Sequence, residues 1–243
     1  SAILVTWFLM KANDIYRLEY HEISFDHHSL KAVLRIGLPA GLESVMYNIA
    51  NLTIQIFVNE LGTDTGAAWG TLGKIDAVFW MVCNAFAISI TTFVGQNYGA
   101  GNVKRCKKVF WLCLLFGFGF TEILAIVFMI WDDFFVSIYT TSSAVAVYGL
   151  IRMHHVCSLE GLTATYEVES SALRGMGKSL EPSIITILGT VVFRLIWMVT
   201  VFKWIPTYDM LMNVYLASWI FTGGAIFIVY WHHMKKFSKY GIH

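Results

Sequence analysis

The sequence predicts an all-α, polytopic membrane protein built as a six-helix transmembrane bundle. Of its 243 residues, 57% are hydrophobic and only 14% are charged, whereas soluble domains average about 25% charged residues. The charged residues gather in short segments, separated by apolar runs long enough for a helix to cross the roughly 30 Å hydrocarbon core of a bilayer. Basic residues favour every second connection between these runs, which is typical of polytopic membrane proteins.

Residues 1–33 are predicted to precede the bundle. Residues 1–10 are apolar but too few to span a bilayer, so we interpret them as the end of a preceding transmembrane helix and the sequence as a fragment. Residues 11–33 mix acidic, basic and histidine side chains with scattered apolar ones. This composition is typical of a cytoplasmic or interfacial linker, partly helical, that ends in an amphipathic approach to the first complete span.

Residues 34–236 are predicted to form the six-helix lobe. Pro39 removes a backbone hydrogen bond near the start of the first span and should bend that helix, while Pro182 opens the fifth span. Residues 132–143 are expected to form an acidic, aromatic loop, and residues 237–243 a cytoplasmic tail. The six predicted spans are residues 34–61, 67–95, 109–131, 144–173, 182–202 and 209–231.

The basic residues also predict the orientation of the lobe. The linker, the connections after the second and fourth spans, and the tail hold most of the lysines and arginines. The opposite connections are acidic, with Lys203 as their lone base. By the positive-inside rule, both ends of the segment are therefore expected on the cytoplasmic side of a cell membrane, plasma or inner.

The sequence lacks motifs for catalysis or for binding a cofactor. It contains no HExxH, no GxSxG and no phosphate-binding loop. The four cysteines show no metal-ligand spacing, so we interpret them as small buried apolar residues. His154 and His155 are adjacent, point about 100° apart on a helix and cannot form one two-ligand metal site. No catalytic residue, resident metal, cofactor or nucleic-acid partner is therefore predicted.

A polar stripe crosses the first span. Glu43, Tyr47, Asn51, Gln55 and Asn59 recur every four residues, which places them along one slowly winding face of a helix. Unpaired polar groups in hydrocarbon cost several kcal/mol each, so the stripe must face protein or water. The stripe offers no resident cation beside Glu43, and a carboxylate without a built-in partner is what a site for a transient cation requires.

Further ionisable residues lie inside the other predicted spans, where each costs roughly 2.5–3.5 kcal/mol on insertion scales and usually marks a pathway or a paired interior site. Spacings of eight and seven residues place three residues of the fourth span on one helix face, together with Thr163. These three are Arg152, Glu160 and Glu167.

A structural role is the alternative for several of these groups. Lys74 is expected to pair with Asp76 or a neighbour, and Arg194 with an acid of the fourth span. Glu122 is expected to pair internally, and Glu169, close to the end of its span, to be solvated. Such pairs would stabilise the bundle without contacting cargo.

Four short segments, in order and at suitable spacing, resemble the MATE (multidrug and toxin extrusion) family. The resemblance covers about residues 30–236 and implies that the chain is the C-terminal lobe, spans seven to twelve, of a twelve-span transporter with two similar six-helix lobes. The N-terminal lobe would then be missing from this sequence. The segments are LRIGLPAGLES (34–44), TTFVGQNYGAGN (91–102), ALRGMGKS (172–179) and FRLIW (193–197), and YLASW (215–219) also fits.

The resemblance also implies that the protein is a secondary antiporter, which expels organic cations and amphipathic drugs against an inward flow of Na⁺ or H⁺. In the sodium-coupled branch, acids are expected about two turns after the proline and about three turns before the LRG turn. This sequence has Tyr47 and Thr163 at those places, and its acids stand at Glu43, Glu160 and Glu167 instead. A coupling Na⁺ would accordingly bind near Glu43 or Glu167.

Alternating access between two lobes is the mechanism this assignment predicts. One alternative is a flippase of the same superfamily for lipid-linked oligosaccharides or glycolipids, which needs bases for pyrophosphate; the spans hold three bases against about six acids, which favours cationic cargo. The other alternative is a membrane sensor or scaffold without transport.

The expected partners are small cationic or amphipathic substrates, a coupling ion, the lipid bilayer and the missing lobe. The predicted substrate- and ion-binding residues are Glu43, Tyr47, Asn51, Gln55, Asp76, Glu160, Thr163, Glu167 and Arg194.

Overall fold

A computed structural model of the protein describes residues 2–12, 17–19, 21 and 24–240. The rest of the predicted linker and residues 241–243 of the predicted tail lie outside the described residues. The chain divides into two compact units, residues 1–35 and 36–243, and each unit is considered by itself.

The first unit contains α1 (Ala2–Lys11) and the beginning of α2 (His27–Glu60). Asp26 precedes α2 and caps it, because its carboxylate accepts hydrogen bonds from the hydroxyl and the backbone N–H of Ser29. These hydrogen bonds lower the pKa of the Asp26 carboxyl. The amphipathic approach expected before the first span is thus helical from His27 onward.

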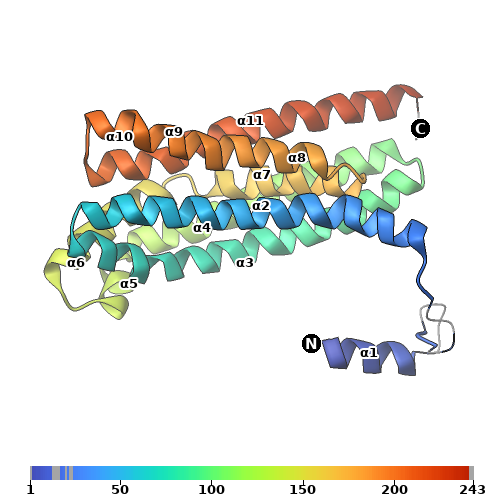
Figure 1. Ribbon diagram of the computed structural model, residues 1–243, viewed down its shortest axis with the longest axis horizontal. Helices are drawn as coiled ribbons and strands as arrows, with labels where there is room; N and C mark the ends of the chain where they lie inside the picture. Colours follow the sequence, from blue (N-terminus) through green and yellow to red (C-terminus); the bar gives the residue numbers. More distant parts are fainter. Residues whose placement is uncertain (1, 13–16, 20, 22–23, 241–243) are drawn as a thin grey trace. The chain divides into compact units, whose positions relative to one another are not determined.

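The second unit consists of helices, joined by short turns (Figure 1). No strand occurs in the described ranges, which confirms the all-α prediction. After α2, the helices are α3 (Thr63–Gly99), α4 (Val103–Ile130), α5 (Asp132–Tyr139), α6 (Ser143–Cys157), α7 (Gly161–Gly175), α8 (Leu180–Thr186), the π-helix η2 (Ile187–Val192), α9 (Phe193–Val199), α10 (Val201–Trp204) and α11 (Tyr208–Tyr240).

Two glycine turns reverse the chain at the same end of this unit. Gly101, between α3 and α4, has φ 72°, and Gly177, between α7 and α8, has φ 75°; both values fall in the left-handed region that favours glycine. We call this the Gly101 end. The opposite end, which holds the α2–α3 turn at residues 61–62, is called the Gly62 end.

Four helical stretches are long and apolar enough to cross a membrane: Thr63–Gly99, Val103–Ile130, Leu180–Trp204 and Tyr208–Lys239. They correspond to the second, third, fifth and sixth predicted spans. The first and fourth predicted spans are more polar, and in the structure they are α2 and the pair α6–α7. Neither α6 nor α7 is long enough to cross a membrane by itself, with 15 residues each.

The structure corrects two expectations about local structure. Residues 132–143 are not simply a loop, because α5 occupies most of them. The fourth predicted span is not one helix, because a turn at residues 158–160 separates α6 from α7. Arg152 on α6 and Glu167 on α7 therefore do not share one continuous helix face.

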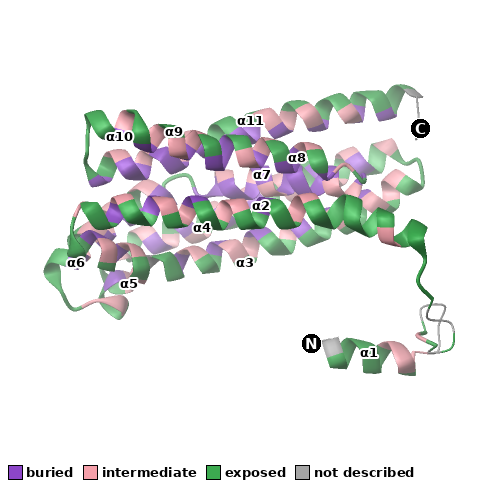
Figure 2. Cartoon of the chain, in the orientation of Figure 1, coloured by how far each residue is buried: buried purple, intermediate pink, exposed green. Residues whose placement is uncertain are grey.

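Helix α7 is the centre of the unit, and it carries buried residues over most of its length (Figure 2). It packs against α3, α4 and α11. Near the Gly101 end its backbone approaches α3 so closely that a Cβ placed on Gly175 would lie 2.7 Å from the carbonyl oxygen of Thr91. Thr91 also donates a hydrogen bond from its hydroxyl to the carbonyl of Ser171, at 3.2 Å. Small residues thus allow the backbones of α3 and α7 to pack closely.

Candidate functional site

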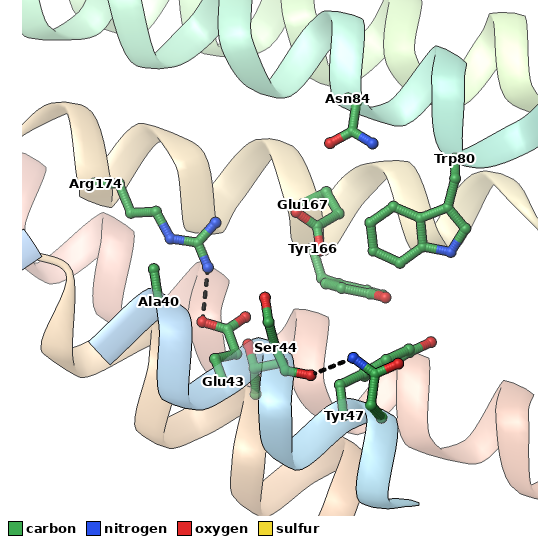
Figure 3. Close-up of a pocket in the computed structure, with 11 residues that line it drawn as sticks. Ala40, Glu43, Ser44, Tyr47, Trp80, Asn84, Tyr166, Glu167 and Arg174 are labelled. Carbon is green, nitrogen blue, oxygen red and sulfur yellow. Dashed lines mark hydrogen bonds and ion pairs between the residues drawn. The ribbon is translucent and has the colours of Figure 1, made fainter. Parts of the chain in front are cut away.

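A polar cleft separates α2 from α3 and α7, and it consists of two pockets that share three residues. The narrower pocket, toward the Gly101 end, has a volume of about 260 Å³. The wider pocket, toward the Gly62 end, has a volume of about 510 Å³. Tyr47 of α2 and Trp80 and Asn84 of α3 line both. Figure 3 shows the narrower pocket, with α2 on one side and α3 and α7 on the other.

The polar stripe of α2 enters this cleft and then leaves it. Tyr47 lines both pockets and meets the ring of Trp80 edge-on, with 6.2 Å between ring centroids. Asn51 lines the wider pocket. Gln55, the next member, is exposed and lines neither pocket. The stripe therefore faces protein and the cleft as predicted over its first part only.

Glu43 is held by an ion pair and a hydrogen bond from two other helices. Its Oε2 lies 2.7 Å from Nη2 of Arg174 at the end of α7 (Figure 3). The same oxygen accepts a hydrogen bond of 2.7 Å from the hydroxyl of Ser183 on α8. The expectation that Glu43 has no resident cation is therefore wrong. Arg174 lies 131 positions from Glu43 in the sequence, in the segment ALRGMGKS, so no local pattern indicates the pair.

A second tie lies on the other side of Pro39. The hydroxyl of Ser179, in the turn before α8, donates a hydrogen bond of 2.8 Å to the carbonyl of Ile36. Together with the contacts of Glu43, it fixes this part of α2 to the α7–α8 turn through side chains. Close backbone packing contributes little here, which leaves room for the cleft.

Glu167 is the acid of the cleft that has no partner. It projects from α7 into the narrower pocket beside Tyr166 (Figure 3). It takes part in no hydrogen bond or ion pair with the described residues, because Arg174, the nearest base, pairs with Glu43. A carboxylate that lines a polar cavity and lacks a protein partner can accept a mobile cation or a proton.

The wider pocket is lined by a charged pair and by four aromatic side chains, called here the aromatic wall: Tyr47, Trp69, Trp80 and Tyr215. Asp76 of α3 pairs with Arg152 of α6, and the guanidinium of Arg152 also lies 4.2 Å from the centroid of the Trp69 ring. The side chain of Arg152 is 5% exposed and that of Asp76 is 33% exposed, so Arg152 is the more deeply buried member of the pair. Of the two partners considered for Lys74, Asp76 or a neighbour, Asp76 is not the one; the ammonium of Lys74 lies 5.9 Å from the centroid of the Tyr139 ring.

Arg194 of α9 lies behind the aromatic wall and is completely buried. Its guanidinium lies 4.4 Å from the ring centroid of Tyr215 and 5.5 Å from that of Tyr47. Its Nε donates a hydrogen bond of 3.1 Å to the hydroxyl of Ser218. No carboxylate of the described residues pairs with it, so the predicted pairing with an acid of the fourth span is wrong.

Glu160 and Thr163 lie behind the cleft, where neither lines one of its two pockets. Glu160 is buried in the turn before α7, and Thr163 donates a hydrogen bond to its carbonyl oxygen at 2.6 Å. Nearby, a carboxylate oxygen of Glu122 accepts the backbone N–H of Gly161 at 2.9 Å. These polar groups stabilise the break between α6 and α7, because the turn leaves backbone groups without helical partners.

Three further findings concern residues outside the cleft. Glu169 is buried, with 4% exposure, and not solvated as expected. The cysteines are free, and three of the four are buried, as predicted. Among the described residues, no group of three histidine, cysteine or acidic side chains is arranged to hold a metal ion.

The cleft also includes residues that the sequence analysis did not select. Trp80 and Asn84 are four residues apart on α3 and line both pockets. An asparagine one turn after a tryptophan in an apolar span could have indicated this face. The narrower pocket is also lined by Tyr166 and Arg174 on α7, and by Ala40, Ser44, Asn48 and Thr186.

Comparison with known proteins identifies the family of this chain. The MatE family model matches residues 39–200, which is more than half of the chain. The chain belongs to the MatE family. This family consists of membrane transporters, which confirms the prediction of a multi-pass membrane protein that is not an enzyme.

In several similar proteins, the match with this chain covers only part of their length. The chain is 23% identical over 166 residues to the probable multidrug resistance protein YoeA of Bacillus subtilis, covering 68% of this chain and 36% of that protein. It is 27% identical over 126 residues to an FAD transporter of Shewanella oneidensis, covering 50% of this chain and 28% of that protein. A solved structure described as the outward-facing conformation of a multidrug resistance MATE family transporter matches with a TM-score of 0.86 and 19% identity, covering 98% of this chain and 54% of that one. The chain thus spans about half of a MATE transporter or less, which confirms the fold predicted as one lobe of two.

Proposed function

We propose that this chain is one lobe of a secondary active exporter, which moves small organic cations or other amphipathic compounds across a cell membrane in exchange for Na⁺ or H⁺. The observation that carries the proposal is Glu167, an acid that lines the narrower pocket without a partner. Relatives with multidrug resistance names support the cargo class. The other lobe would supply the opposite wall of the path, and the Gly101 end would face the cytoplasm.

Exchange follows from the limited charge capacity of the narrower pocket. Glu167, Glu43 and Arg174 together carry one negative charge when all are ionised, so one cation or one proton neutralises them. A cationic cargo and a coupling ion therefore compete for the same site. The lobe binds one when the cleft opens to one side of the membrane and the other when it opens to the opposite side.

Arg174 acts as a tethered counter-ion in this proposal. It lies 2.7 Å from Glu43, and a cation bound at Glu167 would repel its guanidinium toward Glu43. Binding would thereby strengthen the link between α2 and the end of α7. Occupancy of the narrower pocket and the position of α2 would be coupled through one side chain.

The charged residues that line the cleft differ from those counted in the predicted spans, and this difference bears on the flippase alternative. Glu122, Glu160 and Glu169 line neither pocket, so the excess of acids over bases counted in the sequence does not apply to the cleft. A pyrophosphate group needs unpaired bases that it can contact, however, and the two bases that line the pockets, Arg152 and Arg174, are each paired with a carboxylate. The structure therefore favours export of a small molecule over a lipid-linked oligosaccharide flippase.

The test is drug efflux driven by an ion gradient, measured in cells or proteoliposomes. Glu167→Gln keeps the shape of the side chain and removes its charge, so coupled efflux should fall at least tenfold while folded protein is retained. Glu60→Gln, which removes an exposed acid at the other end of α2, is the matched control and should leave efflux unchanged. Undiminished coupled efflux in the Glu167→Gln variant would show that the site assignment is wrong.

A further inference from the structure

A positive charge that the exchange of cations does not use lies behind the wall of the wider pocket. Arg194 is completely buried within this chain, and its two terminal nitrogens make no hydrogen bond of good geometry among the described residues. An uncompensated buried charge is strongly destabilising in an apolar medium. Because the side chain has no exposed surface in this lobe, a second lobe cannot reach it either.

The charged groups around the wider pocket leave one positive charge. Arg152 is neutralised by Asp76, and both line the pocket. Arg194 lies directly behind Tyr47 and Tyr215, which also line it. The unpartnered acid, Glu167, lines the narrower pocket and not this one. A charge in low dielectric acts over several ångströms, so the field of Arg194 reaches the cavity through the two tyrosines.

The walls of the wider pocket indicate the shape of a suitable ligand. Four aromatic side chains contribute to them, and planar rings pack on such side chains in stacked or edge-on arrangements. The tyrosine hydroxyls can donate hydrogen bonds to an anion, and their dipoles are oriented by the guanidinium behind them. The aromatic wall consists of Tyr47, Trp69, Trp80 and Tyr215.

From these features we infer that the wider pocket binds a planar aromatic group that carries an anionic substituent such as a carboxylate. The inference deepens the proposed function, because it takes the cleft as the cargo path, and it adds an anionic pole to the cargo that the cleft accepts. Arg194 is the electrostatic determinant of this site, while Tyr47 and Tyr215 contact the ligand. Asp76 keeps the charge of Arg152 from attracting a second anionic group.

The test is equilibrium binding to the purified protein in phosphatidylcholine nanodiscs, measured by calorimetry near neutral pH with empty nanodiscs as the blank. The probes are naphthoate, naphthamide and naphthylmethylammonium, which share one ring system and differ in charge. Naphthoate should bind at least tenfold more tightly than naphthamide, and the ammonium compound should be the weakest ligand of the wider pocket. No ion gradient is needed, so failure of coupled efflux would leave this result intact, and the reverse also holds.

The preference for naphthoate should disappear in Arg194→Gln and persist in Arg105→Gln, which removes an exposed arginine at the start of α4. If Arg194→Gln gives no folded protein, Tyr215→Phe provides the second measurement and should reduce the preference severalfold by removing one donor. Equal binding of naphthoate and naphthamide to the wild type overturns the inference. The inference is also overturned if Arg194→Gln folds and keeps the preference unchanged. Where Arg194→Gln does not fold, an unchanged preference in Tyr215→Phe overturns it.

Discussion

The two pockets of the cleft balance their charges in different ways. In the narrower pocket, Glu43 and Arg174 pair while the acid Glu167 is left over. In the wider pocket, Asp76 and Arg152 pair while the base Arg194 is left over behind two tyrosines. Each pocket thus has one ion pair that stabilises the lobe and one charge without an ionic partner, which lines the narrower pocket in one case and lies behind the wall of the wider pocket in the other. The pairs should be sensitive to mutation in stability assays, and the unpartnered groups in binding and transport assays.

The largest expected effect separates the two ion pairs. Asp76→Ala leaves Arg152, with a side chain only 5% exposed, without its carboxylate, and breaking such a buried pair costs about 3–5 kcal/mol. Glu43→Ala should cost less, because the side chain of Arg174 is 21% exposed and can reach water in the cleft. Unfolding in mixed micelles, followed by tryptophan fluorescence, measures both. A cost for Glu43→Ala equal to or greater than that for Asp76→Ala would contradict the difference in burial.

The double variant Asp76→Leu with Arg152→Met sharpens this result. Removing both charges leaves no unpaired group, so stability should return to within about 1–2 kcal/mol of the wild type. If the double variant is as unstable as Asp76→Ala, the loss comes from packing around α6 and not from the uncompensated charge.

The second largest expected effect concerns the stability of the contact between α3 and α7 and is not specific to one pocket. Gly175→Ala places a methyl group 2.7 Å from the carbonyl oxygen of Thr91, so α7 must move away from α3, at a cost of about 1–3 kcal/mol for overpacking. Gly99→Ala is the matched control, because a Cβ there meets nothing within 4 Å. The measurement is the unfolding midpoint of each variant. Equal midpoints for the two would show that the α3–α7 contact is looser than described.

The smallest effect concerns the narrower pocket alone. Ser183→Ala removes one of the two partners of the Glu43 carboxylate, while the ion pair with Arg174 remains. The expected loss is about 1 kcal/mol, the usual net contribution of one hydrogen bond. Ser89→Ala, at an exposed serine that bonds only within its own helix, should change stability much less. Naphthoate binding in the wider pocket should not respond to either variant.

Much of the fold could be predicted from the sequence, because the length of each apolar run and the placement of basic turns depend directly on the bilayer that the helices cross. The break between α6 and α7 could not, since no proline marks it and Gly161 is its only local signal. The polar side chains that stabilise this break come from α4 and from the turn itself. Tertiary contacts therefore decided where the helix ends.

The site was predicted in part for a geometric reason. A spacing of four residues advances about 40° around a helix at each step, so a stripe that faces the cleft at Glu43 has turned about 120° by Gln55. Tyr47 and Asn51 consequently line the pockets, whereas Gln55 does not. The pairing of Glu43 with Arg174 joins residues 131 positions apart, which no local pattern can indicate.

The contact between α3 and α7 has a mechanical consequence. At Thr91 and Gly175 the two backbones leave no space for a side chain, so these helices cannot slide past one another and must move as one rigid body. The second half of α2 is attached to that body by buried apolar residues, Ala50, Ile54 and Val58. Its first half, around Pro39, is attached by polar side-chain ties. A change in the width of the narrower pocket therefore requires the first half of α2 to move, and its amplitude is limited by how far the Glu43 and Ile36 ties can extend before they break.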